Sequence, residues 1–172
     1  MTGVTTSADG RTIEPANSLE RHSDGAQPAL NLVIFHLGTH RYGFPTSAIR
    51  EVLPLVTLVR PPECPDAIAG IVQLRGTLLV VVDLRTRLGL PRLAPRISQR
   101  IIVADVGTQH FGLLVDGIDD LVSIENHWND RSDGNVDVVS RVARVGDQIV
   151  ILLNPLAIVD DGIDQFRNRF GQ

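Results

Sequence analysis

The sequence predicts a mainly β fold in which two small five-stranded β-barrels pack together, with short helices between some of the strands. Two observations lead to this prediction. Short apolar runs of strand length alternate with turn residues through residues 30–153. The same pattern occurs twice, about 70 residues apart, so a unit of mostly short strands is duplicated. Five strands in each unit suit a barrel, because a closed barrel has no exposed sheet edge.

The chain of 172 residues has room for one such domain between two tails. We expect the domain at residues 30–160, with the first barrel at about 30–90 and the second at about 98–153. Residues 1–29 are mainly small and polar, so they cannot bury enough surface to offset their ordering entropy. We predict a disordered tail there and a frayed, polar C-terminal tail at residues 161–172.

The first unit opens with two strands, expected at Leu30–Leu37 and Arg41–Phe44, joined by a turn that begins at Gly38. After Pro45, a short helix is expected from Ser47 to Leu53. A further strand is expected at residues 55–59.

The central hairpin runs from Gly70 to Asp83 and turns at Arg75-Gly76. Its second arm, Leu78–Val82, is a continuous aliphatic run, as in strands that are buried on both faces. Gly76 can adopt positive φ without steric cost, which a tight hairpin turn needs. Asp83 then caps a helical turn at Leu84–Leu88.

The second unit repeats these features with nearly constant spacing. The Gly38-Thr39 and Gly107-Thr108 turns lie 69 residues apart, as do the aromatic-glycine pairs that follow them. Leu78–Asp83 resembles Ile149–Asn154 at a spacing of 71 residues. Asn154 is therefore expected to cap a second short helix that starts at Pro155.

Trp128 lies in the polar stretch 124–137 between elements of the second unit. It either covers core residues locally or serves as a docking anchor. Residues 89–98, which hold Arg92 and Arg96, form a connector whose arginines are either a solvated face or an anion or partner site.

Composition excludes several classes of function. The formal net charge is -4 and the sequence contains no lysine, which excludes Schiff-base chemistry and a P-loop. The single cysteine, Cys64, excludes an internal disulfide. No apolar stretch approaches the roughly 20 residues of a membrane span. Small β-barrels often bind nucleic acid, so that function is the alternative, although 4% aromatic residues and negative charge disfavour it.

Motifs for chemistry are absent from the sequence. We find no nucleophile elbow, zinc-protease motif or dinucleotide fingerprint, and the five histidines are not at metal-ligand spacing. We therefore predict no catalytic residues, no metal site and no cofactor. One pair is notable: Glu51, expected on the short helix, and Arg75, at the hairpin tip, could form a bidentate ion pair in one groove. The alternative is a surface ion pair worth about 0–1 kcal/mol.

These motifs together resemble the family of chemotaxis coupling proteins, the CheW-like domains. The resemblance covers about residues 30–160 and is carried by five segments: Tyr42-Gly43, Ile49-Arg50-Glu51-Val52, Gly70-Ile71-Val72-Gln73-Leu74-Arg75-Gly76, Val82-Asp83-Leu84-Arg85 and Phe111-Gly112-Leu113-Leu114-Val115-Asp116-Gly117-Ile118.

The resemblance implies two SH3-like barrels and a non-enzymatic adaptor in the cytoplasm. Such an adaptor links the cytoplasmic tips of chemoreceptors to the regulatory domain of a histidine kinase, at receptor arrays near the inner membrane. It implies possible self-association in the array, no nucleic-acid partner and no direct insertion into the membrane. The implied receptor and kinase groove comprises Ile49, Glu51, Gly70, Arg75, Gly112 and Leu121.

Overall fold

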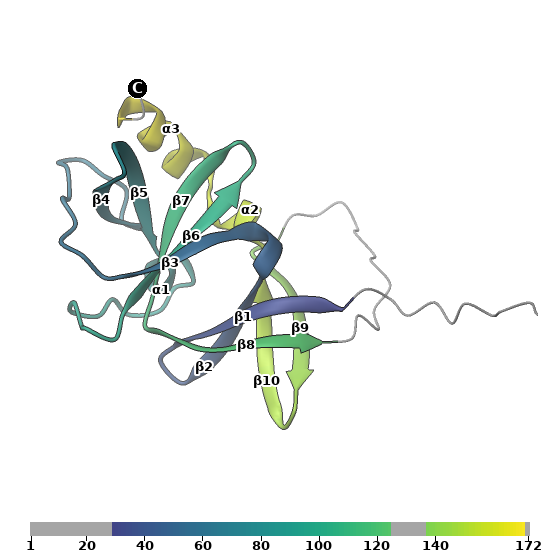
Figure 1. Ribbon diagram of the computed structural model, residues 1–172. Helices are drawn as coiled ribbons and strands as arrows, with labels where there is room; N and C mark the ends of the chain where they lie inside the picture. Colours follow the sequence, from purple (N-terminus) through teal and green to yellow (C-terminus); the bar gives the residue numbers. More distant parts are fainter. Residues whose placement is uncertain (1–28, 125–136, 171–172) are drawn as a thin grey trace, which may run out of the picture.

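The computed structural model describes residues 29–124 and 137–170, and these contain ten strands in two five-stranded sheets (Figure 1). The predicted mainly β fold is confirmed. The expected N-terminal tail, apart from Ala29, and the stretch around Trp128 lie outside the described residues.

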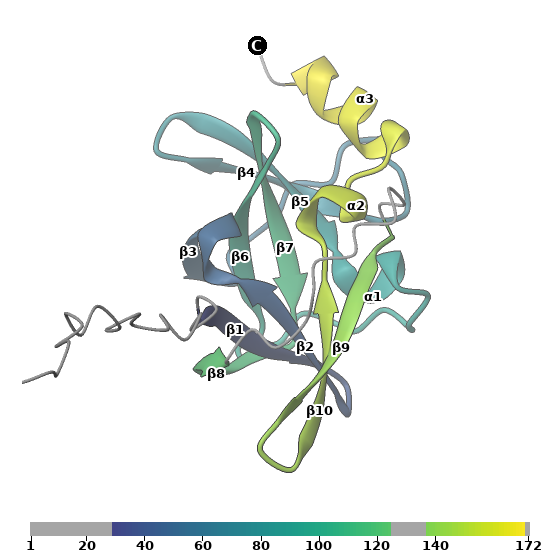
Figure 2. The same cartoon turned by 90° about the vertical axis from the view of Figure 1, so that its right-hand side faces the viewer.

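Each sheet is antiparallel except for one parallel pair, β2 with β10 in the first sheet and β5 with β7 in the second. Figure 2 shows the first sheet below the second. The first sheet has the order β8 (Gly117–Ile124), β1 (Leu30–Leu37), β2 (His40–Pro45), β10 (Gln148–Leu153), β9 (Val139–Val145). The second has the order β3 (Ile49–Pro54), β6 (Arg100–Val106), β7 (Gln109–Val115), β5 (Thr77–Asp83), β4 (Ile68–Leu74).

Strand pairing corrects the expected boundaries within the domain. The first two strands of each unit, β1–β2 and β6–β7, pair with the last three strands of the other unit. Residues 30–90 and 98–153 therefore do not each form a sheet by themselves. The two sheets are still equivalent strand for strand, in agreement with the repeat. The repeat predicted the order of the strands along the chain but not their partners, because the connection after the second strand of each unit crosses to the other sheet.

A shared core joins the two sheets. One hydrophobic cluster contains Phe35 and Phe44 of the first sheet together with Val82, Ile102 and further residues of the second, all fully buried. The rings of Phe35 and Phe44 stack with their centroids 5.0 Å apart. The exchanged strands bring apolar residues of both units into this one cluster. The first sheet has in addition a smaller cluster of its own, formed by Leu32, Ile34, Ala143, Val150 and Leu152.

The prediction of a helix at Ser47–Leu53 is wrong. Only a 3-10 turn, η1 (Thr46–Ala48), precedes β3, which pairs with β6. Exposure alternates residue by residue along Ile49–Pro54, a pattern of period two that indicates a strand. The strand expected at residues 55–59 is also absent, apart from a single bridge between Val59 and Ile71.

Two short helices begin where their caps were predicted. The Asp83 carboxylate accepts hydrogen bonds from the first turn of α1 (Leu84–Arg87), and Asn154 does the same for α2 (Pro155–Ile158). Ser, Thr, Asp and Asn side chains satisfy free N–H groups in this way. None of the helices in the described part of the chain is long and apolar enough to span a membrane.

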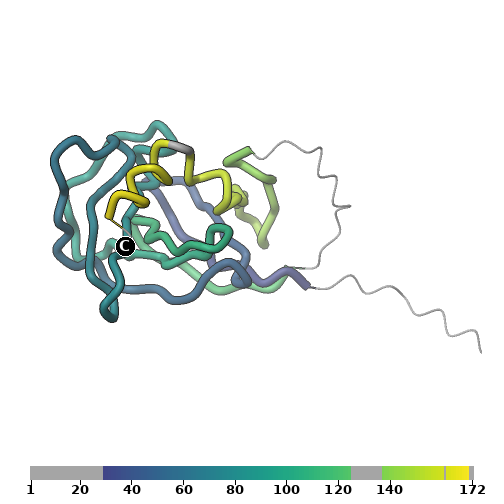
Figure 3. Tube along the Cα trace, turned by 90° about the horizontal axis from the view of Figure 1, so that it is seen from above, coloured from purple at the N-terminus to yellow at the C-terminus, as the bar shows by residue number. Residues whose placement is uncertain are grey.

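The prediction of a frayed C-terminal tail is wrong, because these residues form a ten-residue helix, α3 (Asp161–Phe170). Its Ile163 and Phe166 are buried in the shared core cluster, and Asp160 accepts a hydrogen bond from the Ile163 N–H. Seen from above, this yellow segment lies across the molecule (Figure 3). The helix forms because its apolar residues, three and four positions apart, share one face.

A buried ion pair lies at the junction of the two sheets. The Arg85 guanidinium of α1 lies 2.5 Å from Oδ2 of Asp116, and the two side chains are only 11% and 10% exposed. The same oxygen accepts a hydrogen bond of 2.7 Å from the Gly38 N–H in the β1–β2 turn. Burial raises the pKa of the nearby Tyr42 phenol, while the positive charge of Arg85 opposes that rise.

Candidate functional site

The β4–β5 hairpin presents Arg75 at its tip. Arg75 and Gly76 have φ values of 49° and 86°, so the backbone of both turn residues is in the left-handed region. A two-residue turn of this type matches the twist of the flanking strands, and glycine adopts it without strain. The predicted Arg75-Gly76 turn is therefore confirmed, and the Arg75 side chain is left 78% exposed.

Glu51 lies beside this tip, but on β3 and not on a helix. Nη2 of Arg75 lies 3.0 Å from Oε2 of Glu51, and this is a single contact, not the expected bidentate pair. The Glu51 side chain is 26% exposed. Because an exposed ion pair contributes only about 0–1 kcal/mol to stability, the pair adds little to the stability of the fold.

The pair opens onto a small hollow of about 170 Å³. Its lining combines charged and apolar side chains from the second sheet and from α3: Arg50, Glu51, Leu74, Arg75, Thr77, Leu78, Leu79, Val103, His110 and Arg167. Asp105 lies 2.7 Å from Nε of Arg50 and 2.7 Å from Nδ1 of His110. The hollow thus has a charged rim and one half-exposed apolar side chain, Leu78.

Two of the other predicted groove residues lie apart from this hollow. Ile49 is on β3 but is half-buried against the shared core. Leu121 is on β8 of the first sheet, where it is 67% exposed. Neither lines the hollow, so the structure brings together only Glu51 and Arg75 of the six predicted residues.

The two predicted glycines are buried. Gly70 lies beneath the segment after β3, and a methyl group there would meet Cβ of Leu58 at 2.8 Å. Gly112 lies within the second sheet, where a methyl group would be 2.8 Å from Ile101 and 3.0 Å from Val81. These positions need glycine for close packing, since no Cβ fits there.

We predict that replacing Gly112 by valine overpacks the sheet interior and lowers stability by about 1–3 kcal/mol. Gly43, its repeat equivalent, is enclosed in the same way by Leu152, Ile34 and Val150, so Gly43→Val should have a similar effect. Urea denaturation followed by circular dichroism measures both. Normal stability with loss of partner binding would contradict the packing role and favour a direct contact at Gly112.

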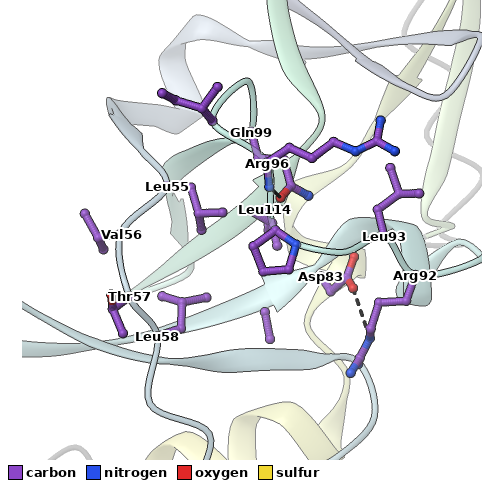
Figure 4. Close-up of a pocket in the computed structure, with 13 residues that line it drawn as sticks. Leu55, Val56, Thr57, Leu58, Asp83, Arg92, Leu93, Arg96, Gln99 and Leu114 are labelled. Carbon is purple, nitrogen blue, oxygen red and sulfur yellow. Dashed lines mark hydrogen bonds and ion pairs between the residues drawn. The ribbon is translucent and has the colours of Figure 1, made fainter.

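A larger hollow of about 610 Å³ lies between the segment after β3 and the connector after α1 (Figure 4). Leu55, Leu58 and Leu114 form apolar walls, and the Asp83–Arg92 ion pair, at 3.2 Å, lies at one side. It shares no lining residue with the hollow at Arg75. The Asp83 carboxylate also caps α1, so its oxygens already accept hydrogen bonds from that helix.

Within residues 29–124 and 137–170, no group of three or more His, Cys, Asp or Glu side chains could hold a metal ion. Sequence reasoning missed the contributions of His110 and Arg167 to the hollow. A signal for Arg167 was present, because Ile163, Phe166 and Phe170 have the spacing of an amphipathic helix. Such a helix would have placed Arg167 on an ordered element.

A family model described as the CheW-like domain matches residues 31–162. The chain belongs to the CheW-like domain family. This agrees with the resemblance carried by the sequence motifs.

Individual CheW-like relatives match over different lengths. The chain is 32% identical over 95 residues to the chemotaxis protein CheW of Rhizobium meliloti (strain 1021), covering 55% of this chain and 61% of the relative. It is 22% identical over 134 residues to the chemotaxis protein CheW of Bacillus subtilis (strain 168), covering 75% and 86%. In the relatives from R. meliloti, Rhizobium etli and Klebsiella aerogenes, the match spans only 55–61% of their length.

Among solved structures, the scaffolding protein TtCheW from Thermoanaerobacter tengcongensis has the same fold. The TM-score is 0.70 at 24% sequence identity, and the match covers 79% of this chain and 96% of the other. The two-subdomain SH3-like architecture expected from the CheW-like motifs is thereby confirmed.

Proposed function

We propose that this CheW-like domain couples chemoreceptors to a CheA-type histidine kinase, and that the receptor's cytoplasmic tip docks at the Glu51–Arg75 pair. The observation that carries the proposal is an exposed, charged hairpin tip beside a hollow with charged and apolar lining, in a member of this adaptor family. In this role the chain works in the cytoplasm, at receptor arrays next to the inner membrane.

The receptor side of the proposal follows from the chemistry of the hollow. A pair of amphipathic helices docks by placing an apolar face on apolar side chains, with polar groups at the margin. Leu78 on β5 is 42% exposed and lines the hollow beside the Glu51–Arg75 pair. An apolar anchor and a charged pair are therefore available together.

We infer that the kinase binds to the first sheet. Val142 on β9 and Ile149 on β10 are 62% and 68% exposed, and Leu121 on β8 is 67% exposed. Exposed aliphatic residues on a sheet suit the apolar end of another small barrel, such as the kinase regulatory domain or a second copy of this chain. The two partners would thus bind different sheets, and a signal would pass as a shift in their relative positions.

Replacing Arg75 by glutamate should weaken binding of a chemoreceptor cytoplasmic hairpin from the same genome by about 10- to 100-fold, because it sets two negative charges side by side. The fold should remain intact, since Arg75 is largely exposed. Isothermal titration calorimetry gives the affinity, and thermal unfolding monitors the fold.

Arg144→Glu is the matched control. Arg144 lies near the tip of the equivalent β9–β10 hairpin, is 76% exposed, and also has one carboxylate partner, Asp147. Its replacement should leave receptor binding unchanged. Equal affinities for wild type and Arg75→Glu would exclude the hairpin tip as the receptor site.

A further inference from the structure

Helix α3 adds a side chain to the hollow at Arg75. Its Arg167 lines that hollow, and the guanidinium carbon lies 5.9 Å from the centroid of the Phe111 ring. In Figure 1, α3 lies at the same end of the molecule as the β4–β5 hairpin. The aromatic ring and the buried apolar face of α3 therefore hold Arg167 beside the exposed ion pair.

Charges around the hollow do not cancel. Arg75 is paired with Glu51, and Arg50 is paired with Asp105 at 2.7 Å. Arg167 has no carboxylate partner among residues 29–124 and 137–170. The hollow thus has an excess of positive charge in a chain whose formal net charge is -4. An uncompensated arginine beside an exposed arginine attracts an anionic group from outside the molecule.

We propose that Arg167 and Arg75 together bind a carboxylate side chain of the docked helical partner. This inference rests on the proposed function and names the chemistry of the partner at that site. A guanidinium holds a carboxylate through parallel N–H donors, and the exposed Arg75 uses one contact for Glu51. The volume of about 170 Å³ is below the roughly 300–1,000 Å³ of small-molecule pockets, so it suits one side chain and not a cofactor.

The proposal makes α3 a specificity element of the adaptor. A receptor tip with a glutamate or aspartate at the matching position gains an ion pair to Arg167. A tip with a neutral residue there leaves the arginine unpaired when the interface excludes water, and this lowers its affinity. The C-terminal helix therefore selects among receptors although it is outside the two sheets.

The test measures binding of a soluble chemoreceptor cytoplasmic hairpin from the same genome by isothermal titration calorimetry. Arg167→Gln removes the charge and the guanidinium that lies over Phe111, but keeps a polar side chain on the same helix. We expect about tenfold weaker binding and a shallower dependence of affinity on salt concentration. Arg169→Gln, on the same helix but outside the hollow, is the control and should bind like wild type.

A double-mutant cycle identifies the partner carboxylate. Each acidic residue of the hairpin is replaced by its amide and tested against wild type and Arg167→Gln. One replacement should weaken wild-type binding about tenfold and have a clearly smaller effect on Arg167→Gln, where only Arg75 still contacts the carboxylate. Two outcomes would overturn the carboxylate assignment alone, provided that the wild type binds. In the first, Arg167→Gln binds as tightly as the wild type. In the second, the effects of Arg167→Gln and of each acidic replacement on the binding free energy simply add. No binding by wild type would overturn the proposed function and this inference together.

Discussion

Replacing Arg85 by methionine is expected to lower the free energy of unfolding by about 3–5 kcal/mol, the largest effect we predict for a single charged residue. The substitution leaves the Asp116 carboxylate buried without its cation, and Asp116 also holds the β1–β2 turn through the Gly38 N–H. Because these groups lie at the junction of the two sheets, the loss should appear as global unfolding at lower urea concentration, followed by circular dichroism.

Arg50→Met provides the comparison. Arg50 forms an ion pair of 2.7 Å with Asp105, but these side chains are 55% and 41% exposed. Water screens such a pair, so its loss should cost only about 0–1 kcal/mol. The double variant Arg85→Met/Asp116→Leu should recover part of the stability lost in Arg85→Met, since no unpaired charge is then buried. Similar small losses for Arg85→Met and Arg50→Met would show that the buried pair does not stabilise the fold.

Replacing Phe166 by alanine should cost about 3–5 kcal/mol, as for other buried aromatic residues. Phe166 is 4% exposed, belongs to the core cluster that joins the sheets, and packs on Phe170 with ring centroids 4.9 Å apart. The measurement is again the urea midpoint, with partner binding recorded in parallel because α3 also positions Arg167.

Arg169→Ala is the control on the same helix. Arg169 is exposed, so its replacement should change stability by less than about 0.5 kcal/mol. If Phe166→Ala also stayed within that range, α3 would be a dispensable tail, as expected from its polar composition. A large loss of stability would instead make the C-terminal helix an integral part of the domain.

Local patterns predicted the Arg75-Gly76 turn and the caps at Asp83 and Asn154 correctly, because each depends on a few neighbouring residues. The approach of Glu51 to Arg75 was also expected, although the element that carries Glu51 was not. A strand at Ile49–Pro54 was missed because Pro45 and Thr46 resemble a helix start. The alternating exposure that identifies the strand arises only when β6 pairs with it.

The six residues taken from the family motifs were separated by the structure into different roles. Glu51 and Arg75 adjoin each other at the surface, whereas Gly70 and Gly112 are enclosed by neighbouring chain. A motif shows that a residue type recurs at a position, but it does not distinguish a packing glycine from a contact residue. His110 and Arg167 come from β7 and α3, so only the folded chain brings them to the same hollow.

By itself, the sequence determined the β class, the duplication, the turns and the family, because these depend on local periodicity and on motifs of neighbouring residues. Only the tertiary structure decided that the two units exchange strands, that α3 completes the core, and that Arg85 meets Asp116. The physical reason is that strand partners and buried ion pairs join residues far apart in the chain. Their stability comes from burying both units in one shared core, and no local pattern records that pairing.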